Sequence, residues 1–131
     1  LEDVDVTAGE PRLRSGEPLG DVLALCQSLS PDALLFNCSQ PEVMEDAVSV
    51  AHTQFSGDSP PLIGVYANAF PLADDNYQGA NATLHELRSD ITPDAYADYA
   101  ERWAAAGAGI IGGCCGISPR HIKCLKDRLA R

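Results

Sequence analysis

The stretch that decides the fold is residues 108–119, which read AGIIGGCCGISP. The short apolar run at residues 108–112 predicts a buried strand. Ser118 followed by Pro119 predicts the start of a helix, because a hydroxyl residue before a proline is a favourable helix beginning. Two cysteines flanked by glycines lie between these elements. A strand that leads through a tight turn into a helix is the repeating unit of parallel α/β proteins.

The same alternation of strand and helix occurs twice before this stretch. Residues 33–38 and 61–69 are apolar runs that predict strands buried on both faces. Apolar residues at helical spacing predict helices over residues 18–29, 40–55 and 93–106, the last with Thr92 as its N-cap. We expect parallel pairing through right-handed crossovers. Both an open doubly wound sheet and a slice of a (β/α)8 barrel fit this order.

Weaker local signals give further expectations. Residues 4–7 resemble the end of a strand, and Ser39 with Glu42 forms a predicted capping box. The polar loop at residues 70–90 is long enough to be functional, and it is expected to contain a short helix over residues 83–87. The last helix is expected to turn these apolar residues inward: Ile122, Leu125 and Leu129.

Composition and charge restrict the class of protein. With 131 residues and 45% hydrophobic residues, the chain is expected to form one structural unit with one core. A net charge of -10 argues against binding to nucleic acid or to an anionic membrane surface. No apolar run approaches the roughly 20 residues of a membrane span, so we expect a cytoplasmic protein. Because the sequence begins with Leu1 rather than Met, we expect it to be either a trimmed chain or a fragment of a longer one.

Three of the five cysteines directly follow predicted strands: Cys38, Cys114 and Cys115. Parallel α/β proteins place their active sites at the carboxyl ends of strands, so these thiols are expected to converge. Gly112, Gly113 and Gly116 would let the chain bend so that adjacent thiols face one ion. Three thiolates leave the fourth position of a tetrahedral Zn²⁺ open, as in catalytic zinc sites. Alternatively, the three cysteines are simply small buried apolar residues.

The remaining cysteines and the histidines are expected to have no chemical role. Cys26 and Cys124 lie on predicted helices and are interpreted as core or near-core thiols. His52, His85 and His121 are expected to be solvated.

Residues 112–122, which read GGCCGISPRHI, closely resemble the GGCCG-(T/S)-P-x-H-I signature of the homocysteine S-methyltransferase family. Asn37 followed by Cys38 is similar to the Asn-Cys motif of that family, and residues 66–69 (YANA) are similar to its Tyr-x-Asn strand. The resemblance extends over nearly the whole chain in the same order.

The resemblance implies a (β/α)8 barrel in which Cys38, Cys114 and Cys115 bind zinc. The thiolate of homocysteine would be the fourth ligand, and it would accept a methyl group to give methionine. Asn37 and Asn68 would lie on the substrate side, although either could instead satisfy backbone groups at a strand end. The donor is expected to be S-methylmethionine or S-adenosylmethionine rather than betaine or a folate.

By the order of the family, residues 1–131 would extend from the end of the fifth strand to the eighth helix. The first half of the barrel would then be missing, and a half barrel exposes strand edges and a face meant for packing. We therefore expect association with another chain, which could be a second copy, or with the missing half. The alternative function is a catalytically incomplete half-barrel remnant that binds zinc or presents thiols and needs a partner chain.

Overall fold

The computed structural model describes residues 1, 10–57, 59–71 and 86–130. The elements in chain order are α1 (Leu19–Leu29), β1 (Ala33–Asn37), the 3-10 helix η1 (Pro41–Val43), α2 (Met44–Gln54), β2 (Leu62–Tyr66), α3 (Pro93–Ala106), β3 (Ile110–Ile111) and α4 (Pro119–Leu129). The predicted alternation of strands and helices is confirmed. The expectations for residues 4–7 and for His85 lie outside the described residues. Of the helix expected over residues 83–87, only residues 86–87 are described, and they are not helical.

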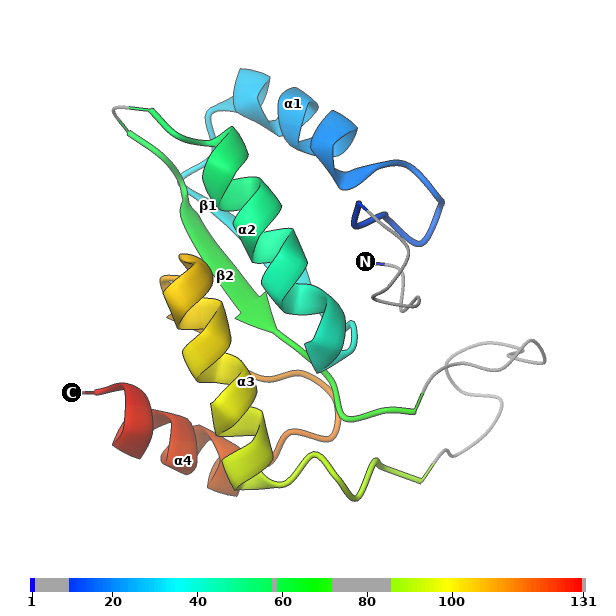
Figure 1. Ribbon diagram of the computed structural model, residues 1–131, viewed down its shortest axis with the longest axis vertical. Helices are drawn as coiled ribbons and strands as arrows, with labels where there is room; N and C mark the ends of the chain where they lie inside the picture. Colours follow the sequence, from blue (N-terminus) through cyan, green and yellow to red (C-terminus); the bar gives the residue numbers. More distant parts are fainter. Residues whose placement is uncertain (2–9, 58, 72–85, 131) are drawn as a thin grey trace.

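The three strands form one parallel sheet in the order β1-β2-β3. Each strand pairs with the next strand along the chain, with a helix between them (Figure 1). The helices pack in succession, α1 on α2, α2 on α3 and α3 on α4. This arrangement is a mixed α/β fold consistent with part of a (β/α) barrel.

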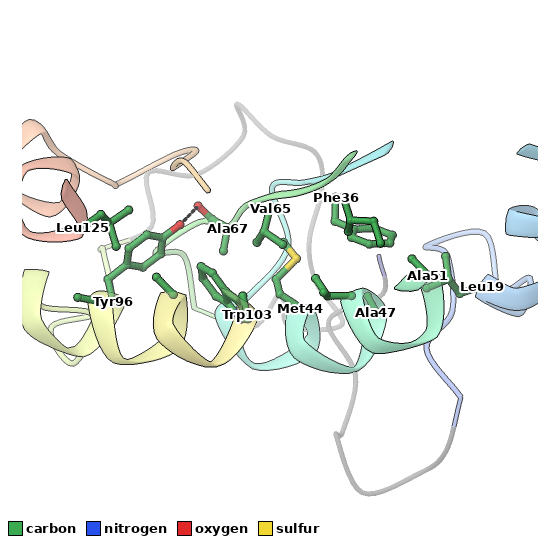
Figure 2. Packing of buried hydrophobic residues seen from close by; sticks show 14 of the residues in the cluster. Leu19, Phe36, Met44, Ala47, Ala51, Val65, Ala67, Tyr96, Trp103 and Leu125 are labelled. Atoms are coloured by element: carbon green, nitrogen blue, oxygen red, sulfur yellow. Dashed lines mark hydrogen bonds between the residues drawn. The ribbon is translucent and has the colours of Figure 1, made fainter. Parts of the chain in front are cut away.

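The hydrophobic core lies between the sheet and the helices (Figure 2). Phe36 and Val65 extend from the strands toward α2 and α3, where Met44, Tyr96 and Trp103 are fully buried. Cys26 and Cys124 pack against the edge of this core, which confirms their interpretation as near-core thiols. Burial of these large side chains provides the main favourable free energy of folding.

The opposite face of the sheet is apolar and exposed. Leu35, Gly64 and Ile110 lie side by side across the three strands. Leu35 is 42% exposed, Ile110 is 36% exposed, and the neighbouring Leu62 is 58% exposed. In a closed barrel this face would be the interior.

The helix beginnings confirm one prediction and contradict another. Thr92 caps α3, and its hydroxyl accepts a hydrogen bond from the Ala95 N–H at 3.2 Å. The capping box predicted at Ser39 and Glu42 is wrong. Pro41 begins a 3-10 turn there and the α-helix starts only at Met44, so the Glu42 carboxylate is free to bind other groups.

The last helix differs from prediction in which side chains it buries. His121, expected to be solvated, is 8% exposed, whereas Ile122, expected to point inward, is 43% exposed. The face of α4 that packs on α3 passes through His121 and Leu125. Leu125 and Leu129 pack against the core as predicted, and His52 is exposed as predicted.

Within the described part of the chain, no helix combines the length and the apolar character needed to span a membrane.

Candidate metal centre

The backbone of the sheet continues past the strand ends and positions the three cysteines. The Cys38 N–H donates to the Tyr66 carbonyl at 2.9 Å, and the Cys114 N–H donates to the Ala67 carbonyl at 2.9 Å. The Cys115 carbonyl accepts from the Ala69 N–H at 2.9 Å. The segment after β2 therefore lies between the two cysteine-bearing segments and is hydrogen-bonded to both.

This pairing brings the three sulfur atoms together. The Sγ atoms of Cys38, Cys114 and Cys115 all lie within 4.8 Å of one another. The Cys38–Cys115 distance is 3.7 Å, and the Cys114–Cys115 distance is 3.8 Å. A tetrahedral ion with metal–sulfur bonds of about 2.3 Å holds its sulfurs about 3.8 Å apart. The group could therefore hold a metal ion.

Unusual backbone conformations allow this convergence. Cys38 has a φ of 51°, in the left-handed region, which turns its side chain away from the direction of β1. Gly116 has a φ of 79°, as the bend after the cysteine pair requires. Gly112 and Gly113 do not have positive φ, but Gly113 has no room for a side chain, since a Cβ there would lie 2.3 Å from Cγ2 of Ile117.

The metal-free thiols differ in their readiness to lose a proton. Burial raises the pKa of the Cys38 thiol, but hydrogen bonds from Cys114, the Cys115 backbone and Asn68 outweigh burial and hold that pKa below its ordinary value. Burial and hydrogen bonding to Cys38 raise the pKa of the Cys114 thiol to about 12. Cys38 is therefore the favoured thiolate of the group, and its negative charge is stabilised by the neighbouring donors.

The two asparagines singled out from the sequence have different surroundings. Asn68 is 3% exposed, and its amide donates to the Cys38 carbonyl at 2.8 Å and contacts the Cys38 sulfur at 3.8 Å. Its Oδ1 accepts from the Phe70 N–H at 3.0 Å. Asn37 is exposed at the end of β1. The structure thus brings Asn68 to the thiols and uses its amide to hold Cys38.

Comparison with known proteins places the chain in a family. The model of the homocysteine S-methyltransferase family matches residues 4–129. The chain belongs to this family. It is 33% identical to homocysteine S-methyltransferase of Escherichia coli (strain K12) over 117 residues, which cover 88% of the chain and 34% of that relative.

Two plant relatives show how far the similarity extends. Homocysteine S-methyltransferase 1 of Zea mays is 30% identical over 119 residues, covering 89% of the chain and 34% of the relative. A selenocysteine methyltransferase of Astragalus bisulcatus is 22% identical over 109 residues, covering 79% of the chain and 30% of the relative. This member of the homocysteine S-methyltransferase family spans about a third of the length of these relatives.

Arg14 lies beside the thiols and was not found by sequence reasoning. Its Nη2 donates to the Cys38 carbonyl at 2.8 Å, and its Nε donates to the Leu1 carbonyl at 3.2 Å. An arginine in a polar segment that also contains Arg12 carries no pattern that links it to a cysteine 24 residues away.

A second group missed by sequence reasoning joins η1 to the loop that follows β2. Arg88 donates to both carboxylate oxygens of Glu42, at 3.0 and 2.6 Å, and also binds Asp90. The Tyr99 hydroxyl donates to Glu42 at 2.8 Å. The Arg88 N–H donates to the Ala69 carbonyl at 2.9 Å, so the group joins the chain close to Asn68.

Replacing Glu42 by Gln should lower the free energy of unfolding by about 1–3 kcal/mol at pH 7, because Arg88 and Tyr99 lose a charged partner. Burial raises the pKa of Glu42, but hydrogen bonds from Arg88, from the backbone and from Tyr99 outweigh burial and hold that pKa below its ordinary value. The stabilisation is therefore complete above the unfolded-state pKa and is lost as the pH falls through the lower folded-state pKa. Urea unfolding at pH 7 and in acid would measure the difference.

Glu45→Gln is the matched control. Glu45 is on α2, and its side chain is 44% exposed with Arg102 at 3.7 Å. Its loss should change stability by less than about 0.5 kcal/mol at either pH. Equal effects of the two substitutions, or a Glu42→Gln effect that does not shrink in acid, would contradict this account.

Proposed function

We propose that Cys38, Cys114 and Cys115 bind one Zn²⁺ and that the site methylates the thiol of homocysteine to give methionine. The observation that carries the proposal is the spacing of the sulfurs, 3.7 and 3.8 Å, which suits a tetrahedral ion. Three thiolates leave one position for a substrate sulfur, and membership of the homocysteine S-methyltransferase family supports homocysteine as that substrate. Bound zinc would lower the pKa of the substrate thiol, so that a thiolate exists at neutral pH.

The proposed reaction is a direct displacement at a methyl carbon. The homocysteine sulfur forms a new bond to the methyl group, and the bond from that carbon to the donor breaks with its electron pair staying on the donor. The proton of the homocysteine thiol is released to solvent. A sulfonium donor, S-methylmethionine or S-adenosylmethionine, fits this step because it leaves as a neutral thioether, and we propose it over betaine or a folate.

Residues of this chain would hold the reacting sulfur in place. Asn68 and Arg14 both donate to the Cys38 carbonyl and so fix the left-handed turn that aims the Cys38 sulfur. We propose that Asn68 acts indirectly, by holding the cysteine that helps to bind the homocysteine sulfur. We propose that Asn37, exposed at the end of β1, contacts the amino-acid part of homocysteine directly. Positioning of this kind is a large part of catalysis in a displacement reaction.

We also propose a cytoplasmic location, because all five cysteines are free thiols, which persist in a reducing compartment.

Assembly with further strands is the second part of the proposal. The exposed sheet face bears Leu35, Leu62 and Ile110. An apolar groove beside β3 is lined by Ile111, Ile122, Leu125 and Leu129, among others. The chain spans about a third of its relatives' length. We propose that further parallel strands, from the rest of a longer polypeptide or from another chain such as a second copy, cover these surfaces.

Light scattering on the purified chain should show association, because the exposed apolar face favours burial. Leu62→Glu, on the sheet face, should shift the chain toward a monomer. Leu29→Glu, which replaces a 78% exposed leucine on α1, should not. A wild-type chain that is monomeric and monodisperse at all concentrations would contradict the assembly proposal.

Alanine at Cys38, Cys114 or Cys115 should abolish zinc binding, because two thiolates and solvent hold the ion far more weakly than three thiolates. Alanine at Cys26 or Cys124, which lie at the edge of the core, should leave it intact. Elemental analysis of protein purified without chelator, followed by competition with a chromogenic chelator, would measure this. Zinc retained by a variant with alanine at all three of these positions would contradict the proposed site.

The alternative function, a zinc- or thiol-binding half barrel without catalysis, differs in its product. Methionine formed from homocysteine and S-methylmethionine by the zinc-loaded chain supports the enzyme, and zinc binding without methionine supports the alternative.

A further inference from the structure

Tyr96 is a fully buried tyrosine on α3 whose ring lies beneath the ends of β2 and β3. Its ring meets Trp103 edge-on at 5.4 Å and His121 edge-on at 5.8 Å between ring centroids. Figure 2 shows the side chain extending from α3 toward Ala67, with the hydroxyl at its tip. Packing on both sides leaves the ring little freedom, so the hydroxyl has a fixed position.

The hydroxyl contacts the backbone of both segments that converge at the thiols. It lies 2.9 Å from the Gly112 carbonyl, to which it donates, and 3.4 Å from the Ala67 carbonyl. The Ala67 carbonyl also accepts the Cys114 N–H, at 2.9 Å. The phenol therefore joins the end of β2 to the glycine pair that leads into the two cysteines.

The other end of the cysteine turn is held by His121. The His121 Nδ1 accepts from the Ser118 N–H at 3.1 Å. This leaves Nε2 to carry the proton and to donate to the Ile91 carbonyl at 2.9 Å. His121 also packs on the Tyr96 ring. The two buried side chains together therefore restrain the turn on both sides, Tyr96 before the cysteine pair and His121 after it.

We propose that Tyr96 is a positioning residue that holds the Cys114–Cys115 turn in its metal-binding conformation through its hydroxyl. This inference rests on the metal site proposed above. The turn is rich in glycine, so it gains much conformational freedom when released. Without the hydroxyl, the ion would have to order the turn itself, and its affinity would fall. Partners that hydrogen-bond to metal ligands typically change affinity about 10–100-fold, and we expect an effect of the same order from this bond to the backbone beside the ligands.

Tyr96→Phe removes only the hydroxyl and should weaken Zn²⁺ binding about 10–100-fold. Tyr99→Phe is the matched control, since Tyr99 is on the same helix and donates to Glu42 at 2.8 Å, away from the thiols. It should leave Zn²⁺ affinity unchanged. Competition with a chromogenic chelator measures both affinities, and Co²⁺ substitution reports through its thiolate charge-transfer band whether three sulfurs still bind.

Hydrogen exchange in the metal-free chain separates this inference from the metal site. Tyr96→Phe should speed exchange of the Cys114 amide, which bonds to the Ala67 carbonyl beside the hydroxyl, more than Tyr99→Phe does. A wild-type chain that binds no metal overturns the proposed function, and the exchange comparison then decides the role of Tyr96 alone. A wild-type chain that binds metal, with Tyr96→Phe equal to it in affinity and exchange, overturns the role of Tyr96.

Discussion

The structure depends on the hydrogen bonds that continue the parallel ladder beyond the strands on both sides of β2. Parallel strands place their carboxyl ends at one edge of the sheet, and here the ladder runs on until Cys38 is bonded to Tyr66 at the end of β2 and Cys114 to Ala67 just after it. Three thiols from two segments that are far apart in the chain thereby meet within 4.8 Å. Backbone pairing, rather than direct attraction between the cysteines, creates the candidate site.

The core and the site are two consequences of one layer arrangement. The helices bury Phe36 and Val65 on one face of the sheet, and the aromatic residues of α3 extend that core to the strand ends. The same packing brings Tyr96 and His121 beneath the cysteine turn. The opposite sheet face has no such cover in the described residues, which is why we propose assembly with further strands.

Much of this could be predicted because it depends on local pattern. Apolar periodicity located the strands and helices, Thr92 and Pro93 marked the start of α3, and cysteines after parallel strands were expected to converge. Other features depend on tertiary packing that leaves no local pattern. His121 follows Pro119 in what reads as an exposed first turn, and its burial arises only because α4 packs on α3. Glu42 fitted a capping box, but the 3-10 turn and a distant Arg88 give it a different partner.

X-ray absorption at the zinc edge of the purified chain, with and without homocysteine, tests the proposed metal site directly. We predict three sulfur neighbours near 2.3 Å from Cys38, Cys114 and Cys115, and a fourth when homocysteine is added. Zinc surrounded by nitrogen and oxygen neighbours, or a sulfur shell that homocysteine leaves unchanged at saturating concentration, would contradict it.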